Sequence, residues 1–146
     1  MSKLSHAPAL VFFDIDGTLL DEQRQIPESA RNAIRQLRRN GHLAFLNTGR
    51  SYAAIHPEIQ EVGFDGIIAA NGTWIQYQGQ LLYNKTMDPK VLSSILPVME
   101  ESEIDVWMEG PEHVYFESLT SPSENVIEYI ELFSVLPGVS RDWHEG

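Results

Sequence analysis

Residues 10–19, Leu-Val-Phe-Phe-Asp-Ile-Asp-Gly-Thr-Leu, join a short apolar run to two aspartates and a glycine. Continuous apolar runs of this length are typical of strands buried on both faces, as in a parallel sheet. Asp14 and Asp16 stand two positions apart, so an extended chain would project both carboxylates to the same side. Close carboxylates repel each other unless a cation or a shared proton relieves them, and Mg²⁺ prefers such oxygen ligands. The stretch predicts a buried strand that carries a cation site; an ordinary Asp-x-Asp-Gly turn is the alternative.

Two similar apolar runs follow along the chain: residues 43–46 precede Asn47 and Thr48, and residues 67–70 precede Asn71. Between the first two runs, a proline, apolar residues at helical spacing and a closing glycine predict a helix over residues 27–40. A second helix is predicted from residue 51 towards residue 62, with Pro57 as a kink or an early end. This alternation of strands and helices predicts an α/β fold with a Rossmann-like parallel sheet.

Each of the three predicted parallel strands is followed by a polar residue: Asp14, Thr48 or Asn71. One such residue is usually turn chemistry, because Asp and Asn start turns well. Ligands of open parallel sheets bind outside the carboxyl ends of the strands, where all three residues fall. Three polar groups in register, each near a glycine, favour a ligand site over three separate turns.

The pattern changes after Asn71. Residues 73–77 and 81–84 predict a β-hairpin, and Asp88-Pro89 predicts the start of a helix that runs to about residue 99. Residues 104–109 and 113–117 predict a second hairpin, and Ser121-Pro122-Ser123-Glu124 predicts a capping box before a last helix. We therefore predict a core domain over residues 1–84 and a different, α+β unit over residues 85–146.

Composition excludes several classes of function. The 146 residues carry a net charge of −11, which argues against binding to a nucleic-acid backbone. Cysteine is absent, so disulfide scaffolds, thiolate zinc sites and thiol catalysis are excluded. The apolar runs are too short to span a bilayer, and the first residues lack the pattern of a signal peptide. We expect a soluble, cytoplasmic protein with no membrane partner.

Three segments together resemble the haloacid dehalogenase-like (HAD) hydrolase superfamily. Asp14–Leu19 resembles its first signature, Asp-x-Asp-Gly-Thr-Leu, and Asn47-Thr48-Gly49-Arg50 resembles its second, in the Thr-Gly-Arg form of the Cof-type subfamily. The Asn71-Gly72 pair resembles the Asn-Gly segment of that subfamily. The resemblance covers residues 9–84 and extends loosely into an α/β cap from about residue 85, so a HAD-like core with an incomplete cap is expected.

The resemblance implies a Mg²⁺-dependent phosphatase that forms an aspartyl-phosphate. By similarity, Asp14 is the nucleophile, and Asp16 protonates the leaving alcohol and then activates water. Mg²⁺ would be held by the Asp14 carboxylate and the Asp16 backbone carbonyl. Thr48 and the Gly49 N–H would bind a phosphoryl oxygen. The substrate class that the resemblance implies is a small phosphorylated metabolite, such as a sugar phosphate or a nucleotide.

Two further residues of these segments have open roles. Arg50 either reaches the substrate or braces its own loop by ion pairing. Asn71 either orients the site, as a candidate substrate-binding residue, or serves only an ordinary turn. The sequence leaves both alternatives standing.

The sequence departs from the superfamily pattern after Thr48. The superfamily completes its site with a later lysine and an acidic Gly-Asp-type motif, both after the cap, but only Lys85 and Lys90 follow Thr48. We therefore expect the N-terminal part of a longer enzyme, which would need a homo-oligomer or a separate C-terminal half to cover its sheet. Two alternatives stay open: an inactive fragment that serves as an interaction module, and a receiver-like phospho-acceptor.

Overall fold

The computed structural model describes residues 7–102, 104–117, 122–136, 138 and 140–143. The chain divides into two compact units. The first unit comprises Met1–Gly49 and Pro57–Asn84, and the second comprises Arg50–His56 and Lys85–Gly146. The short segment from Arg50 to His56 thus groups with the second unit, although the chain on both sides of it belongs to the first.

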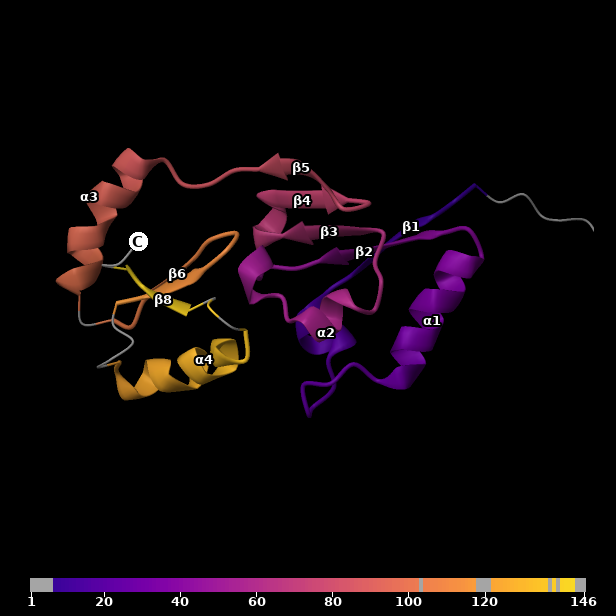
Figure 1. Cartoon of the computed structure of the whole chain (residues 1–146), viewed down its shortest axis with the longest axis horizontal. Coiled ribbons are helices and arrows are strands. Elements are labelled where there is room, and N and C mark those ends of the chain that lie inside the picture. Colours follow the sequence, from indigo (N-terminus) through magenta and orange to yellow (C-terminus); the bar gives the residue numbers. More distant parts are fainter. Residues whose placement is uncertain (1–6, 103, 118–121, 137, 139, 144–146) are drawn as a thin grey trace, which may run out of the picture. The chain divides into compact units, whose positions relative to one another are not determined.

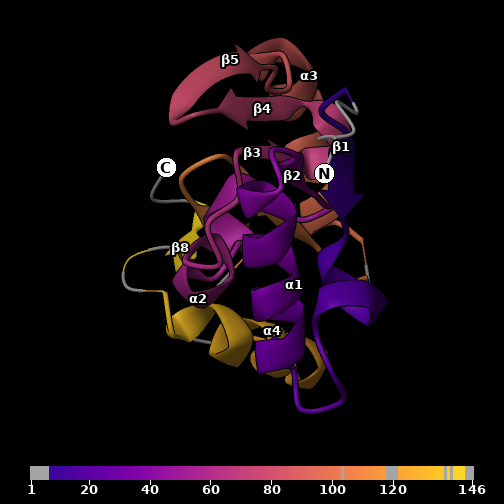
Figure 2. The same cartoon turned by 90° about the vertical axis from the view of Figure 1, so that its right-hand side faces the viewer.

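A five-stranded sheet forms the first unit. Its strands follow the order β1 (Leu10–Phe13), β2 (Leu43–Asn47), β3 (Gly66–Ala69), β4 (Trp74–Tyr77) and β5 (Gln80–Asn84). β1, β2 and β3 are parallel, and β4 and β5 continue the sheet as an antiparallel hairpin, side by side in both views (Figure 1 and Figure 2). The predicted α/β fold with a parallel Rossmann-like core is confirmed.

Helix α1 (Glu28–Arg39) follows Pro27, whose fixed φ suits the entry of a helix. Ile34 is 1% exposed and anchors the helix, while Arg38 and Arg39 occupy the last turn, where cations are favoured. The chain leaves through Gly41 at a φ of 88°. This left-handed conformation costs glycine little, and it closes the helix as the sequence predicts.

The helix predicted from residue 51 towards residue 62 is interrupted at Pro57, as expected, but its first part is not an α-helix and its second part starts at the proline. The structure has a 3-10 turn, η2 (Tyr52–Ala54), and a separate short helix, α2 (Pro57–Gln60). Pro57 lacks an N–H and cannot continue a helix from the preceding turn, but it fits the first position of a new one. The proline therefore begins α2.

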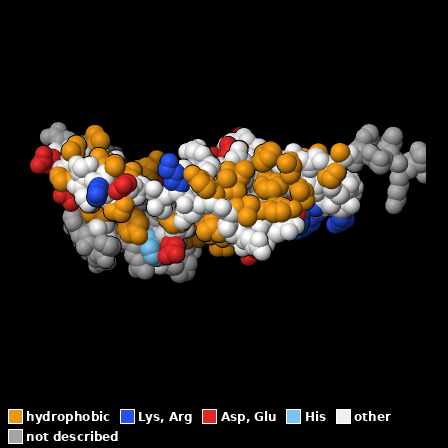
Figure 3. Space-filling view, turned by 90° about the horizontal axis from the view of Figure 1, so that it is seen from above, with side chains coloured by type: hydrophobic (Ala, Val, Ile, Leu, Met, Phe, Trp, Pro, Cys, Tyr) orange, Lys and Arg blue, Asp and Glu red, His pale blue; other side chains and the backbone are white. Residues whose placement is uncertain are grey.

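The two faces of the first sheet differ in burial. Ala44, Leu46 and Ala69 are fully buried on one face. On the other, Phe12, Phe45 and Tyr77 pack in a row across the strands, with ring centroids 5.5 and 5.8 Å apart, yet Phe12 is 51% exposed. The edge strand β5 exposes its leucines, and hydrophobic side chains gather over the first unit (Figure 3).

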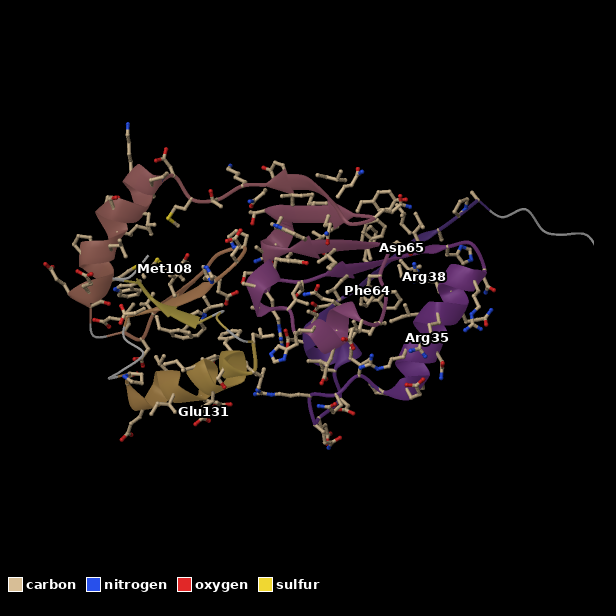
Figure 4. The ribbon with its side chains drawn as sticks, viewed as in Figure 1. Arg35, Arg38, Phe64, Asp65, Met108 and Glu131 are labelled. Atoms are coloured by element: carbon tan, nitrogen blue, oxygen red, sulfur yellow. The ribbon has the colours of Figure 1, made fainter. Side chains whose placement is uncertain are left out.

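An ion pair links α1 to the loop before β3. The guanidinium of Arg38 donates from Nε and Nη2 to the two carboxylate oxygens of Asp65, at 3.1 and 2.9 Å (Figure 4). Asp65 Oδ2 also accepts the N–H of Ala44 in β2 at 2.9 Å. Burial raises the pKa of Asp65, but the Arg38 hydrogen bond, the Ala44 N–H and the Arg38 charge outweigh it and lower that pKa below 3.8. The folded state therefore favours the ionised carboxylate.

Asp65→Asn is expected to lower the free energy of unfolding by about 1–2 kcal/mol at pH 7, because it removes a paired, hydrogen-bonded charge. The folded pKa of Asp65 is lowered, so its contribution is present above 3.8 and is lost as pH falls through the folded value. Urea unfolding should therefore show the two proteins converging in acid. Glu28→Gln, which breaks the exposed Arg35–Glu28 pair, is the control and should change little at either pH. A constant difference between wild type and Asp65→Asn at all pH values would contradict this account.

Among its described residues, the second unit holds a three-stranded sheet and two α-helices. In chain order these are α3 (Pro89–Glu100), β6 (Trp107–Glu109), β7 (Val114–Phe116), α4 (Glu124–Ser134) and β8 (Ser140–Asp142). Asp88 caps α3 by accepting the Lys90 N–H at 2.8 Å, as its position before Pro89 predicts. The predicted hairpin of β6 and β7 is antiparallel, and β8, which the sequence analysis missed, pairs parallel to β7.

A buried cluster joins the elements of the second unit. Val114 and Phe116 of β7 pack with Phe133 of α4, and Ala54 of η2 belongs to the same core. α4 begins at Glu124, two residues later than the predicted start at Pro122, and Ser123 precedes it without a side-chain capping hydrogen bond. Ser121 of the predicted capping box lies outside the described residues. None of the helices built by the described residues has the length and apolar character of a membrane span.

Candidate active site

The two aspartates lie in a closed loop that begins where β1 ends. Asp14 keeps an extended backbone, and Asp16 (φ −79°, ψ 121°) and Gly17 (φ 73°, ψ 5°) then have the dihedral angles of a type II turn. The third position of such a turn requires a positive φ, which explains glycine at position 17. The Leu20 N–H closes the loop on the Ile15 carbonyl oxygen at 3.2 Å.

The apolar side chains of this loop are buried, and its two aspartates are exposed. Ile15 is 0% exposed and Leu19 is 4% exposed, whereas the side chains of Asp14 and Asp16 are exposed. The two apolar side chains therefore anchor the loop in the core of the first unit. The carboxylates keep their contact with solvent, so neither needs a buried counter-charge.

Strand register brings the loop to the same sheet edge as Thr48. Phe13 pairs with Leu46, and Asn47 pairs with Ile68, so the carboxyl ends of β1, β2 and β3 meet at one edge. Thr48 follows β2, is 4% exposed and donates its N–H to the Ile68 carbonyl oxygen at 2.9 Å. Hydrogen bonding to β3 thus holds the Thr48 backbone in place.

Asn71 reaches the Thr48-Gly49 segment from the end of β3. Its N–H donates to the Thr48 carbonyl oxygen at 3.2 Å. Its side-chain oxygen lies 3.4 Å from the position that a Cβ on Gly49 would take, so the amide packs against that glycine. The structure therefore brings together three of the predicted site residues, Thr48, Gly49 and Asn71. Ala70, with a left-handed φ of 48°, belongs to the same turn, and no sequence signal marks an alanine for that conformation.

Arg50 groups with the second unit. Its Nη1 donates to the carbonyl oxygen of Ala54 at 3.5 Å. The next residue, Ser51, is 3% exposed and donates its N–H to Glu109 Oε2 of β6 at 3.0 Å. The sequence analysis did not single out Ser51 or Glu109, because their contact spans 58 positions and matches no local motif.

The donor set of the aspartate loop fits a Mg²⁺ ion. Two exposed carboxylates and the backbone carbonyls of the loop are hard oxygen donors. No group of three or more acidic or histidine side chains suited to a metal occurs in the described part of the chain. Mg²⁺ usually takes only one or two carboxylates and completes its shell with water and substrate phosphate, so the donors of this loop are compatible with the ion.

Comparison with known proteins decides the family. Residues 11–137 match the model of a protein family described as "haloacid dehalogenase-like hydrolase". The chain belongs to this family. The match spans both units, so the resemblance seen in the sequence signatures is confirmed. It favours the hydrolase interpretation of the aspartate loop over the receiver-like one.

Curated members of the family that resemble the chain carry phosphatase names. Phosphatase YwpJ from Bacillus subtilis is 32% identical over 113 residues, which are 76% of this chain and 36% of YwpJ. HMP-PP phosphatase from Cronobacter sakazakii is 31% identical over 86 residues, 58% of this chain and 32% of the relative. The chain spans about a third of the length of these HAD relatives.

A solved structure shares the fold of this HAD chain. The crystal structure of a hypothetical protein from Geobacillus kaustophilus HTA426 superposes with a TM-score of 0.76 at 24% identity. The match covers 96% of this chain and 54% of the other. At this identity the likeness concerns the fold alone, and it supports the α/β assignment.

Proposed function

We propose that this HAD-family protein is a Mg²⁺-dependent phosphatase that hydrolyses a small phosphate monoester through an aspartyl-phosphate on Asp14. The observation that carries the proposal is the anchored loop after β1, which holds two exposed carboxylates at the sheet edge where Thr48 also lies. The phosphatase names of relatives such as YwpJ support the same class of reaction.

In the first half-reaction, a carboxylate oxygen of Asp14 attacks phosphorus and the bond to the leaving oxygen breaks. Asp16 donates its proton to that oxygen, so the leaving group departs as a neutral alcohol. In the second half-reaction, Asp16 takes a proton from water, the water oxygen attacks phosphorus, and the bond to Asp14 breaks. Inorganic phosphate leaves, and both aspartates return to their starting states.

Thr48 and Gly49 are proposed to hold the phosphoryl group. The Thr48 hydroxyl and the Gly49 N–H are neutral donors, and such donors stabilise the charge that builds up on phosphoryl oxygens. When bound by the Asp14 carboxylate and the Asp16 carbonyl, Mg²⁺ supplies further charge stabilisation for the same oxygens. Arg50 and Asn71 are candidates for contact with the substrate.

The substrate is proposed to be a small phosphorylated metabolite, a sugar phosphate or a nucleotide. The name of the relative HMP-PP phosphatase supports a small phosphorylated compound rather than a macromolecule. Residues 85–146 are proposed to form the cap that selects the substrate. A phosphate-release screen over sugar phosphates and nucleotides, with and without Mg²⁺, tests the proposal. Mg²⁺-dependent release from at least one compound by the native gene product is expected, and no release from any would contradict it.

The 146-residue chain alone is expected to hydrolyse p-nitrophenyl phosphate far below the usual enzyme range of roughly 1–10³ s⁻¹. The superfamily completes its site with a later lysine and an acidic motif after the cap. The only lysines after Thr48 are Lys85 and Lys90, at the entry to the cap, and no Asp-Asp or Gly-Asp-x-x-x-Asp motif follows. Steady-state release of p-nitrophenolate under excess Mg²⁺ measures this, with Asp14→Asn as the blank. A turnover within that range would show that the chain needs no further cationic residue. Turnover indistinguishable from the blank would favour the alternative, an inactive interaction module.

We expect the chain to be isolated as a homo-oligomer or together with a companion polypeptide. β1 lies at the edge of the first sheet, and its Leu10 and Phe12 are more than half exposed. Sheet edges pair readily with other chains, and exposed apolar faces are rarely left bare. Light scattering coupled to size-exclusion chromatography measures the mass of the assembly, and denaturing mass spectrometry of the same peak identifies the polypeptides in it. A stable monomer of 16.5 kDa without a companion would contradict this expectation.

A further inference from the structure

Two consecutive non-glycine residues with left-handed backbones follow the end of β3. Ala70 has a φ of 48° and Asn71 has a φ of 53°. Left-handed conformations are unfavourable for residues with a Cβ, although asparagine tolerates them better than most. Such strain persists only where the surrounding structure holds it, and it is common at functional sites.

The hydrogen bonds of this turn show what holds it. The Thr73 N–H and hydroxyl both donate to the Ala70 carbonyl oxygen, at 3.2 and 2.9 Å. The Asn71 N–H turns back to the Thr48 carbonyl oxygen at 3.2 Å, while the Thr48 N–H donates to Ile68. Both backbone polar groups of Thr48 are therefore bound by the end of β3.

The bond to the Thr48 carbonyl oxygen has a consequence for Gly49. The Thr48 carbonyl and the Gly49 N–H belong to one planar trans peptide, in which the two groups point in opposite directions. Fixing the carbonyl oxygen on Asn71 therefore fixes the direction of the Gly49 N–H. The side-chain oxygen of Asn71 also lies 3.4 Å from the position that a Cβ on Gly49 would take.

We propose that Asn71 is a positioning residue for phosphate binding. The left-handed turn formed by Ala70 and Asn71 directs the Asn71 N–H to the Thr48 carbonyl oxygen, and this bond holds the Thr48–Gly49 peptide so that the Gly49 N–H keeps one orientation. This inference rests on the proposed function, in which the Gly49 N–H contacts a phosphoryl oxygen. It assigns Asn71 a role through Gly49 and not through the substrate.

The test is a titration of the 146-residue chain with inorganic phosphate, followed by the NMR resonance of the Gly49 amide. Asn71→Ala, which disfavours the left-handed backbone, is expected to weaken phosphate binding by about 5–30-fold. Asn71→Gly, which adopts that backbone freely, is expected to bind within about 3-fold of wild type. Equal losses in both variants would overturn the role of the backbone.

Gln78→Ala is the matched control, because Gln78 also has a left-handed φ, of 49°, in the hairpin turn between β4 and β5. It should lower stability as Asn71→Ala does and leave phosphate binding unchanged. An equal loss of phosphate binding in this control would overturn the proposal, since the effect would then be general destabilisation.

Hydrogen exchange of the Asn71 amide, without phosphate, separates the proposal from the proposed function. We expect protection of this amide in wild type and in Asn71→Gly, and faster exchange in Asn71→Ala. If phosphate does not shift the Gly49 amide resonance in wild type, the proposed phosphate contact is wrong. The exchange rates of the Asn71 amide still test whether Asn71 positions the Thr48–Gly49 peptide. Unchanged exchange and an unchanged Gly49 resonance in Asn71→Ala would overturn the positioning itself.

Discussion

Asp14→Asn is expected to reduce phosphatase turnover of the native gene product by more than about 10⁴-fold, because the neutral amide cannot attack phosphorus. The substitution is nearly isosteric, and the side chain is exposed beside an anchored loop. The fold should therefore survive, with an unchanged melting temperature. Phosphate release from the best substrate of the screen, measured under saturating Mg²⁺, gives the ratio of the two rates.

Asp21→Asn is the control for this loss. Asp21 is an exposed carboxylate in the next loop, where it accepts the N–H groups of Gln23 and Gln25 at 3.0 and 2.8 Å. Asp21→Asn changes the net charge by the same amount as Asp14→Asn and should keep the wild-type turnover. Activity of Asp14→Asn within about tenfold of wild type would refute the assignment of the nucleophile.

Asp16→Asn is expected to slow turnover by roughly 10²–10⁴-fold, the usual contribution of a general acid–base. The loss should depend on the leaving group, because p-nitrophenolate departs without a proton whereas a sugar alkoxide needs one. In the first half-reaction, Asp16→Asn should therefore lose less rate on p-nitrophenyl phosphate than on a sugar phosphate. Rapid-quench kinetics on both substrates measure that step.

Dephosphorylation should be slow in Asp16→Asn whichever substrate is used, because the same general base serves both. The phosphoenzyme is therefore expected to accumulate. An equal loss in the first half-reaction for the two leaving groups would contradict the role of Asp16 as the acid.

Much of the core of the first unit was predictable because its signals are local. The apolar runs of β1, β2 and β3 mark strands buried on both faces, and Gly17 and Gly41 stand where positive φ is required. The hairpin of β4 and β5 follows from the Gln78-Gly79 pair. These features depend on a few neighbouring residues, so no long-range information is needed.

Other parts of the fold depend on contacts that the sequence does not display. Pro57 is compatible with the end of one helix or with the start of another, and in the structure it is the first residue of α2. β8 is three residues long, too short for a period of two to be recognised, and its pairing with β7 is non-local. Arg50 follows the Thr-Gly motif directly, yet its segment groups with residues far along the chain.

The candidate site shows the same division. The positions of Asp14, Asp16 and Thr48 after their strands could be predicted, and the structure places the ends of β1, β2 and β3 at one edge. The contact of Asn71 with Gly49 could not, because it depends on two left-handed residues, one of them an alanine. The chemical roles of these residues stay predictions until they are measured.

The most direct test of the account is the location of the phosphoryl group during turnover. The protein is incubated with Mg²⁺ and substrate, quenched in acid, digested and mapped by mass spectrometry. A phosphoryl group is expected on the peptide that contains Asp14, removable by hydroxylamine and absent from Asp14→Asn. A phosphoryl group on a serine, threonine or histidine, or turnover that continues without any label on Asp14, would contradict it.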